Sequence, residues 1–341
     1  MTHRDIKYKN KNLTIHKSVT TPHFNEKTVL VTSTWDYVDL WLKRAGKKDA
    51  RFFWSQARSF YDATKMLPKT SAPLTAYYCF LNATKTLLLA KGVQFSDEHG
   101  VSGYTKKGHT SLSNEQVKFK TSGILPALCR HLGEPAVQDT YTLKDLLYNL
   151  PGIHRAFTLT FSSDTELFIP LKEPKIVKSA KTDEAWFSAR ITDQYATNHT
   201  TNKLPIKFER DISIEDSFTI RSTDRFKWKA KQVPQNLARY KTYHTKLRKK
   251  IYYINGAQSF WYLKRGGNIS GLIQRSSMTI AFAAMHKLSE MARYEPDKLS
   301  RHFDCQHNWL LSEFISSASA QFVDEISSEL TGHEFILPGR N

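Results

Sequence analysis

The hydrophobic period of this chain changes twice, and the order of the changes restricts the fold more than any single motif does. Apolar residues recur at helical spacing up to about residue 152, short β-patterned segments follow as far as residue 263, and helical spacing then returns. A strand-rich block between two helical parts predicts an α+β fold. We expect the N- and C-terminal helices to pack together, with an antiparallel β block inserted between them.

The first helical part begins with two well-marked helices. Apolar side chains in 51–67 and 71–92 recur every three or four residues. In the second segment Ser71 is a plausible N-cap, Pro73 lies in the first turn, and Gly92 supplies a stop. The sequence therefore predicts two antiparallel helices joined by a short turn.

Two shorter helices and a polar segment complete this part. Residues 95–122 are rich in Gly, Ser, Thr, Lys and His, which predicts a long surface loop or a pair of short strands. Helical pieces are expected at 124–133 and 142–152, and Thr142 and Asp145 form a capping box at the start of the second.

The β block shows short runs of β-branched or aromatic residues between turn residues. Strands are expected at 156–161, 165–171, around 185–191, at 204–209 and at 217–222. Asn255 and Gly256 separate two apolar runs within 251–263, which is a strong β-hairpin signal.

The return to helical spacing predicts helices at 271–294 and at roughly 304–330. The chain then divides into an N-terminal arm (1–34), an N-terminal helical part (35–154), a basic β block (155–266) and a C-terminal helical part (267–341).

One stretch concentrates the positive charge. Residues 221–250 hold eleven Lys or Arg and one acid, Asp224, and so carry +10 of the formal net charge of +18. Phe226, Trp228 and Ala230 alternate there with lysines, which predicts a strand with one apolar and one cationic face, on or just before the hairpin.

Clustered cations interleaved with aromatic residues favour a polyanionic partner, although a merely solvated basic face would look the same. The chain has 50 Lys and Arg against 32 Asp and Glu. Tyr240 and Tyr243 either stack on bases or fill the core. The candidate nucleic-acid contacts are these two tyrosines with Arg225, Lys227, Lys229, Lys231, Arg239, Lys241, Arg248, Lys249 and Lys250.

The cysteines and apolar runs bear on location and cofactors. Cys79, Cys129 and Cys305 stand alone, without a Cys/His spacing suited to zinc, which fits a reducing cytoplasm. The longest apolar runs are interrupted by polar residues, and no apolar h-region follows the N-terminal cations. We expect no metal, no cofactor, no membrane span and a cytoplasmic location.

Four segments together resemble the YaaC-like family of bacterial cytoplasmic proteins. They are the run 72–92, the pair His99-Gly100, the run 145–154 and the turn 291–296. The resemblance spans most of the chain. It implies a fold and a setting, since members are sometimes encoded among phage-defence genes, and it implies no particular reaction.

The paired helices are also remotely similar to the HEPN superfamily, whose nucleases carry an Arg and a His separated by four to six residues. Arg301 and His307 meet that spacing with a polar residue after the Arg; Arg239 and His244 meet it with an aromatic residue there. The resemblance implies that Arg301 binds the scissile phosphate and that His307 transfers a proton without a metal. The alternative is a pair at a helix start that serves solubility or local pairing.

The polar segment contains a second candidate for phosphate binding. Lys106, Lys107 and His109 lie among glycines that would let backbone amides approach an anion. Neither a Walker motif nor a GxGxxG motif is present, so a mobile polar loop is the alternative.

Three functions remain open at this point. The first is nucleic-acid binding, RNA or DNA, as a component of a phage-defence or stress system. The second is a metal-independent ribonuclease that uses Arg301 and His307. The third is a non-catalytic adaptor whose basic face docks an acidic protein. Partner proteins of a defence complex and a homodimer are both compatible with the sequence.

Overall fold

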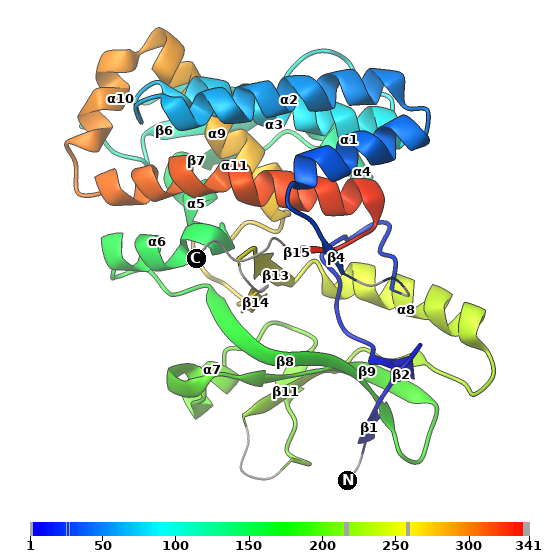
Figure 1. Cartoon of the computed structure of the whole chain (residues 1–341). Helices are drawn as coiled ribbons and strands as arrows, with labels where there is room; N and C mark the ends of the chain where they lie inside the picture. The colour runs from blue at the N-terminus through cyan, green and yellow to red at the C-terminus, as the bar shows by residue number, and fades with distance from the viewer. Residues whose placement is uncertain (1–2, 25, 27, 215–217, 257–259, 337–341) are drawn as a thin grey trace.

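The computed structural model describes residues 3–24, 26, 28–214, 218–256 and 260–336. Figure 1 shows most of the long helices gathered at one end of the molecule and a curved sheet at the other. The fold is α+β, as the order of periods predicts.

Helices form in the N-terminal part where the sequence predicts them, and a further helix at Thr34–Arg44, which no expected segment covers, precedes them. Together they are α1 (Thr34–Arg44), α2 (Lys48–Met66), α3 (Ala72–Ala90), α4 (Ile124–His131) and α5 (Leu143–Tyr148). The capping box of α5 is confirmed, because Thr142 Oγ1 accepts from Asp145 N at 3.0 Å and Thr142 N donates to Asp145 Oδ2 at 3.3 Å.

The C-terminal helices are α9 (Ser277–Tyr294), α10 (Pro296–Phe303) and α11 (Asn308–Thr331). They pack on the N-terminal helices: the rings of Phe80 in α3 and Phe322 in α11 stack with centroids 4.1 Å apart. The expected association of the two helical ends is therefore confirmed.

The polar segment forms a pair of short strands, which was one of the two expected alternatives, and a third strand completes a small antiparallel sheet. It consists of β5 (Val101–Thr105), β6 (Glu115–Phe119) and β7 (Thr140–Thr142). Val101, Val117 and Phe119 are buried in the helical core, so the hairpin β5–β6 is held against the helices.

The main sheet is antiparallel and has the strand order β10-β11-β9-β8-β14-β13, with β1 added to β8 and β12 added to β9. A register shift between Lys172 and Lys175 interrupts the β8–β9 pairing, as at a β-bulge. The strands are β1 (His3–Asp5), β8 (Phe168–Ser179), β9 (Glu184–Ile191), β10 (Phe208–Arg210), β11 (Thr219–Ser222), β12 (Phe226–Lys227), β13 (Ile251–Ile254) and β14 (Phe260–Lys264).

The N-terminal residues belong to the body of the protein. Besides β1, they form the pair β2 (Lys7–Tyr8) and β3 (Lys11–Asn12). Further on, β4 (Val29–Leu30) pairs in parallel with β15 (Phe335–Ile336), which places the segment before α1 beside the segment after α11.

Three local expectations are wrong or incomplete. Residues 156–161 form most of α6 (His154–Thr160), because Ala156 and Phe157 are buried on one helical face and this packing overrides β propensity. The hairpin β13–β14 exists, but its pairing of Ile254 with Phe260 leaves five residues in the connection instead of two. Residues 257–259 of that connection, and residue 217 of an expected strand, lie outside the described residues.

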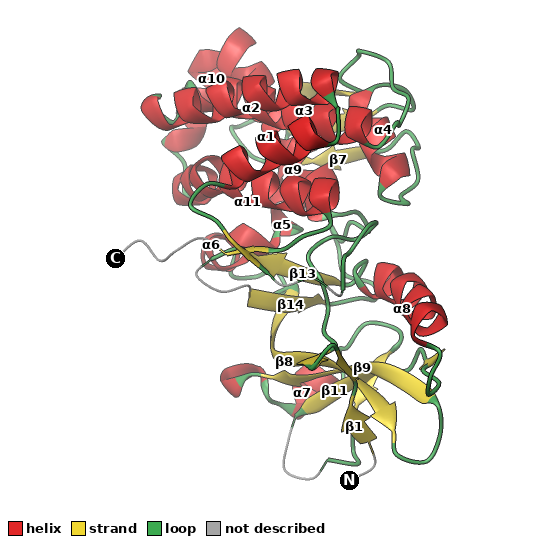
Figure 2. Cartoon of the chain, turned by 45° about the vertical axis from the view of Figure 1, so that its right-hand side comes forward, coloured by secondary structure: helices red, strands yellow, loops and turns green. Residues whose placement is uncertain are grey.

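The third correction concerns the basic stretch, which is mainly a helix. After the two-residue strand β12, residues Val233–Leu247 form α8, which begins with a proline in its first turn. Figure 2 shows α8 beside the strands and apart from the other long helices. The remaining helical turns are α7 (Asn198–Thr201) and the 3₁₀ turns Pro151–Ile153 and Asp193–Tyr195.

Two hydrophobic clusters reflect this organisation. One fills the helical end, with Trp54, Phe80 and Phe282 among its buried side chains. The other lies between the sheet and α8, where Phe187 and Tyr240 are buried. In the described part of the chain, we find no helix that combines the length and the apolar character needed to cross a membrane.

Candidate nucleic-acid interface

The lysines that alternate with Phe226, Trp228 and Ala230 do not lie on one extended strand. Only Phe226 and Lys227 pair with β9. The side chain of Asn236 in α8 then bonds both backbone groups of Lys229, at 3.0 Å to N and 2.7 Å to O, and so turns the chain into the helix. The predicted cationic strand face is therefore replaced by cations on β12, the turn and α8.

Tyr240 and Tyr243 are buried and offer no ring face to a base. Tyr240 is 0% exposed and donates its hydroxyl proton to Thr14 O at 2.8 Å. Tyr243 is 6% exposed, and its hydroxyl accepts from Phe187 N at 2.8 Å. Burial raises the pKa of Tyr243 to about 12. Both rings attach α8 to the sheet, so of the two alternatives the core role is the one observed.

Arg248 is also removed from the candidate contacts. Its side chain is 8% exposed and donates to Lys17 O at 3.1 Å and to Ile251 O. The guanidinium therefore cross-links backbone segments inside the protein.

Three of the remaining candidate cations, Arg225, Lys227 and Arg239, line a pocket of about 510 Å³ between β12 and α8 together with Lys246, which was not a candidate. We call it the α8 pocket. Arg225 stacks on the ring of Trp186, with 4.6 Å from its guanidinium carbon to the ring centroid. The acid in the lining, Asp224, is 3.3 Å from Lys207 in an ion pair. The cations of the pocket, none of which has a carboxylate partner among the described residues, are Arg225, Lys227, Arg239 and Lys246.

A second pocket, of about 230 Å³, lies where α8 ends and β14 leaves the sheet, and we call it the Arg265 pocket. Lys249, Lys250, Lys264 and Arg265 line it, and no acidic residue is among its described lining residues. Pockets that gather four cations without a carboxylate favour an anionic ligand.

Arg265 and Lys264 are the unusual members of this group. Arg265 is 8% exposed; its Nε donates to Glu166 O at 2.8 Å, and its Nη1 is buried without a hydrogen-bond partner in the described structure. Lys264 is 4% exposed and donates to Ile273 O at 2.7 Å. Burial lowers the pKa of Lys264 to about 7, although Glu134 acts in the opposite direction. Both side chains would gain from a bound anion.

The two pockets are neighbours. Thr223 N donates to Lys207 O at 2.9 Å, which ties the segment beside the α8 pocket to the residue after Ile206. Ile206 lines the Arg265 pocket, and its carbonyl accepts from the ammonium of Lys250. The α8 pocket and the Arg265 pocket therefore adjoin each other near the end of α8.

The other two candidate motifs meet at a separate pocket of about 440 Å³, which we call the Arg301 pocket. Lys106, Lys107 and His109, in the connection between β5 and β6, line it together with Arg301. Arg301 is ion-paired with Asp297 at 3.1 Å, both side chains being well exposed. His307 is 4% exposed and does not line the pocket. The proposed Arg301–His307 pair thus does not face one cavity.

Below the Arg301 pocket is a buried polar cluster that the sequence did not reveal. Glu115 accepts from Lys287 at 2.9 Å, from Thr105 at 2.7 Å and from His302 Nε2 at 3.2 Å. Burial alone would raise the pKa of Glu115, but the hydrogen bonds from His302, Thr105 and Lys287 lower it to about 2.

The same cluster engages His302 on both sides. His302 Nδ1 is 2.8 Å from His307 Nε2, so both ring nitrogens of His302 have partners. Burial, with His302 adding to it, lowers the pKa of His307 to about 4. This arrangement stabilises the junction of β6, α9 and α10 and leaves no imidazole nitrogen of His302 for a substrate. The ribonuclease that would use Arg301 and His307 remains an untested prediction.

Sequence reasoning found the basic stretch and missed Lys264 and Arg265. Lys264 is the last residue of the strand β14, and Arg265 follows it directly and precedes Gly266 and Gly267. Two cations between a predicted strand and two glycines are a usable local signal, because such a segment leaves the sheet where backbone and side chains can approach a ligand.

Comparisons with known proteins place the chain in one family. No curated protein and no solved structure matches it significantly. The family model described as YaaC-like protein matches residues 16–330, which is nearly the whole chain. This protein therefore belongs to the YaaC-like family.

Proposed function

We propose that this protein binds nucleic acid, with phosphate groups held in the Arg265 pocket and along the α8 pocket. The observation that carries the proposal is the Arg265 pocket itself. Four cations line it without an acid among the described lining residues, and one of them, Arg265, has a buried Nη1 without a hydrogen-bond partner in the described structure. A phosphate oxygen is a strong acceptor for such a group.

The α8 pocket extends the same surface. Its cations form no ion pair with a carboxylate in the described structure, so a ligand would not have to displace a counter-charge. Arg225 and Arg239 donate to neutral oxygen atoms of Ser222, Asp224 and Asn236. Phosphates repeat along a nucleic-acid backbone, which suits cations spread over two adjoining pockets better than a single small anion does.

The first experiment measures binding of labelled single- and double-stranded RNA and DNA at rising salt by fluorescence anisotropy. We expect the affinity to fall steeply with salt, because cations that contact phosphates release bound counterions. The variant Lys249→Ala/Arg265→Met should bind more weakly. The matched control Lys43→Ala/Lys47→Ala removes two exposed lysines at the helical end and should bind like wild type.

An acidic protein is the competing partner, and the same assay separates the two. Polyglutamate added at equal charge should displace the oligonucleotide poorly if phosphates are recognised. Absence of oligonucleotide binding at low salt, or equal binding by wild type and Lys249→Ala/Arg265→Met, would remove the proposal.

The cellular location and the biological role are further proposals. We infer a cytoplasmic protein, supported by the three free thiols of Cys79, Cys129 and Cys305. A place in a phage-defence or stress system follows from the resemblance alone. Phage infection of cells with and without the gene tests it, and equal survival of the two would count against it.

A further inference from the structure

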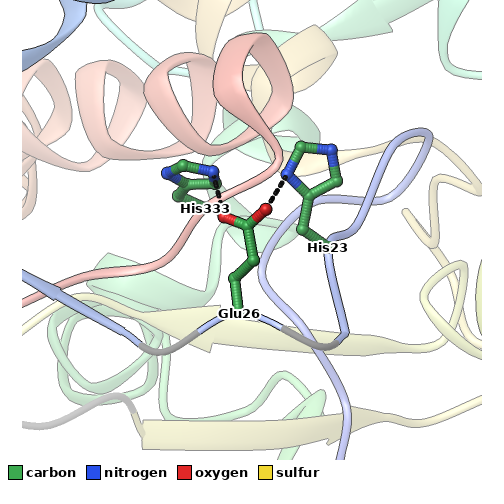
Figure 3. A group of neighbouring side chains, drawn as sticks. All are labelled: His23, Glu26 and His333. Atoms are coloured by element: carbon green, nitrogen blue, oxygen red, sulfur yellow. Dashed lines mark ion pairs between the residues drawn. The ribbon is translucent and has the colours of Figure 1, made fainter.

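Three side chains from the two ends of the chain meet in a cluster that the proposed nucleic-acid interface does not use. His23, Glu26 and His333 each offer one ligand atom, and these atoms lie within 4.8 Å of one another. Figure 3 shows the carboxylate of Glu26 between the two imidazole rings. We propose that this cluster binds a divalent transition-metal ion, with Zn²⁺ as the best-suited probe.

The backbone holds the ligands in place without a metal. His23 N donates to Gly332 O at 3.0 Å, and Glu26 N donates to His23 O at 3.2 Å. A few residues further on, Val29 N donates to Glu334 O at 2.8 Å, where β4 and β15 pair. The segment that carries two ligands is therefore fixed to the segment that carries the third.

Gly332 permits this close approach. It ends α11 in the left-handed conformation, with φ of 76°, so a residue with a side chain would be strained there. A Cβ atom would also lie 2.5 Å from Thr21 O and 2.9 Å from the ring of His23. The glycine thus allows the ring of His23 to lie against the end of α11, next to His333.

The spacing of the donor atoms is close to that of a metal site. Glu26 Oε1 is 3.6 Å from His23 Nδ1, and Glu26 Oε2 is 2.5 Å from His333 Nε2. A tetrahedral ion about 2.1 Å from each ligand separates its ligands by about 3.4 Å. The distance between Glu26 and His23 already fits this separation. The distance between Glu26 and His333 can widen by rotation of the Glu26 side chain, which is 45% exposed.

Tyr37 in α1 supplies an outer contact of the kind that metal-binding histidines use. Its hydroxyl oxygen is 2.8 Å from His333 Nδ1. With Nε2 bound to a metal, Nδ1 carries the ring proton and donates it to Tyr37, which fixes the tautomer and the ring orientation.

The donor set indicates the class of ion. Two imidazoles and one carboxylate suit Zn²⁺ and related first-row ions, whereas Ca²⁺ and Mg²⁺ prefer oxygen ligands. The three residues also line a pocket of about 130 Å³ that includes His16 and Lys11. Three protein ligands beside a pocket leave a coordination position for water or another small ligand.

The test uses full-length protein stripped of metal with a chelator. Competition between the protein and a colorimetric zinc indicator gives stoichiometry and affinity. We expect one zinc per chain, with binding at least about tenfold weaker in Glu26→Gln and His333→Ala. His199→Ala is the matched control, because His199 is exposed in α7 and should not change the affinity. Equal zinc binding by wild type, Glu26→Gln and His333→Ala would overturn the proposal.

Two further measurements separate a metal site from a general loss of structure. Tyr37→Phe keeps the ring and removes the hydroxyl, and it should weaken zinc binding by about tenfold. Zinc should raise the unfolding temperature of wild type but not that of Glu26→Gln, whose substituted side chain is half-exposed in the folded protein. An equal rise in both proteins would count against the site, whatever the outcome of the nucleic-acid experiments.

Discussion

The ammonium group of Lys17 lies 3.0 Å from the carboxylate of Asp324, and both side chains are almost fully buried. The hydroxyl of Tyr253 donates to the same carboxylate at 2.8 Å, and Lys17 also donates to Asn255 Oδ1 at 3.0 Å. Burial raises the pKa of Asp324, although Lys17 opposes that effect. One buried ion pair thus joins the N-terminal segment, the β13–β14 hairpin and the last helix.

We expect Asp324→Ala to lower the free energy of unfolding by about 3 to 5 kcal/mol, because it leaves the buried Lys17 ammonium without its counter-charge. Urea unfolding monitored by circular dichroism measures the change. The double variant Lys17→Met/Asp324→Leu should recover much of the loss. A single variant within about 1 kcal/mol of wild type would show that the pair contributes little.

Glu115 should make stability depend on acid pH. Its pKa in the folded protein is about 2, below its ordinary value of 4.5, so its contribution is complete above 4.5 and is lost as the pH falls toward 2. Glu115→Gln should cost about 2 to 3 kcal/mol near neutral pH and progressively less below about pH 4. Urea unfolding at several pH values checks this, with the exposed Glu98→Gln as control. A difference that is independent of pH would contradict the assignment.

Binding of an anion in the Arg265 pocket should take up protons. The pKa of Lys264 is about 7 in the free protein, so its amine is largely neutral above that pH. A bound phosphate favours the charged form and raises the pKa, and proton uptake follows at about pH 8. Calorimetry of oligonucleotide binding in buffers with different ionisation enthalpies measures the uptake.

The matching variants are Lys264→Met, which should abolish the uptake, and Lys249→Met, which should keep it because Lys249 is exposed. Unchanged uptake in Lys264→Met would place the linked proton elsewhere.

The cations of the α8 pocket should set the salt dependence of binding. Lys227→Ala/Lys246→Ala removes two exposed ammonium groups that line the pocket. Each lost phosphate contact lowers the slope of log affinity against log salt by about 0.7 to 0.9. Anisotropy titrations at four salt concentrations give the slope, with Lys43→Ala/Lys47→Ala as control. Equal slopes for the two double variants would exclude the α8 pocket from the interface.

Local sequence patterns were sufficient to predict most of the helices and the fold class. Apolar residues at helical spacing in α2, α3, α9 and α11 predict the face that each helix buries, and these faces do pack in the helical core. The same approach failed for α6 and α8. Their aromatic and β-branched residues favour strands in isolation, but Phe157, Tyr240 and Tyr243 fill helical positions against a core.

The candidate site was predictable only in part. The sequence located the positive charge, yet it did not distinguish the buried Arg248, which cross-links backbone carbonyls, from its exposed neighbour Lys249. The role of a cationic residue depends on how deeply its side chain is buried and on its hydrogen-bond partners. Burial and hydrogen bonding in turn depend on segments that are distant in the chain.

The sequence by itself determined the class of fold and the net charge of the β block, because the period of apolar residues and the count of cations are local properties. Only the tertiary structure decided which cations share a pocket without an acid and which residues from opposite ends of the chain meet. Lys17 and Asp324, or His23 and His333, lie about three hundred residues apart. Hydrogen bonds and ion pairs act over a few ångströms, so such pairs exist only after the fold has brought their segments together.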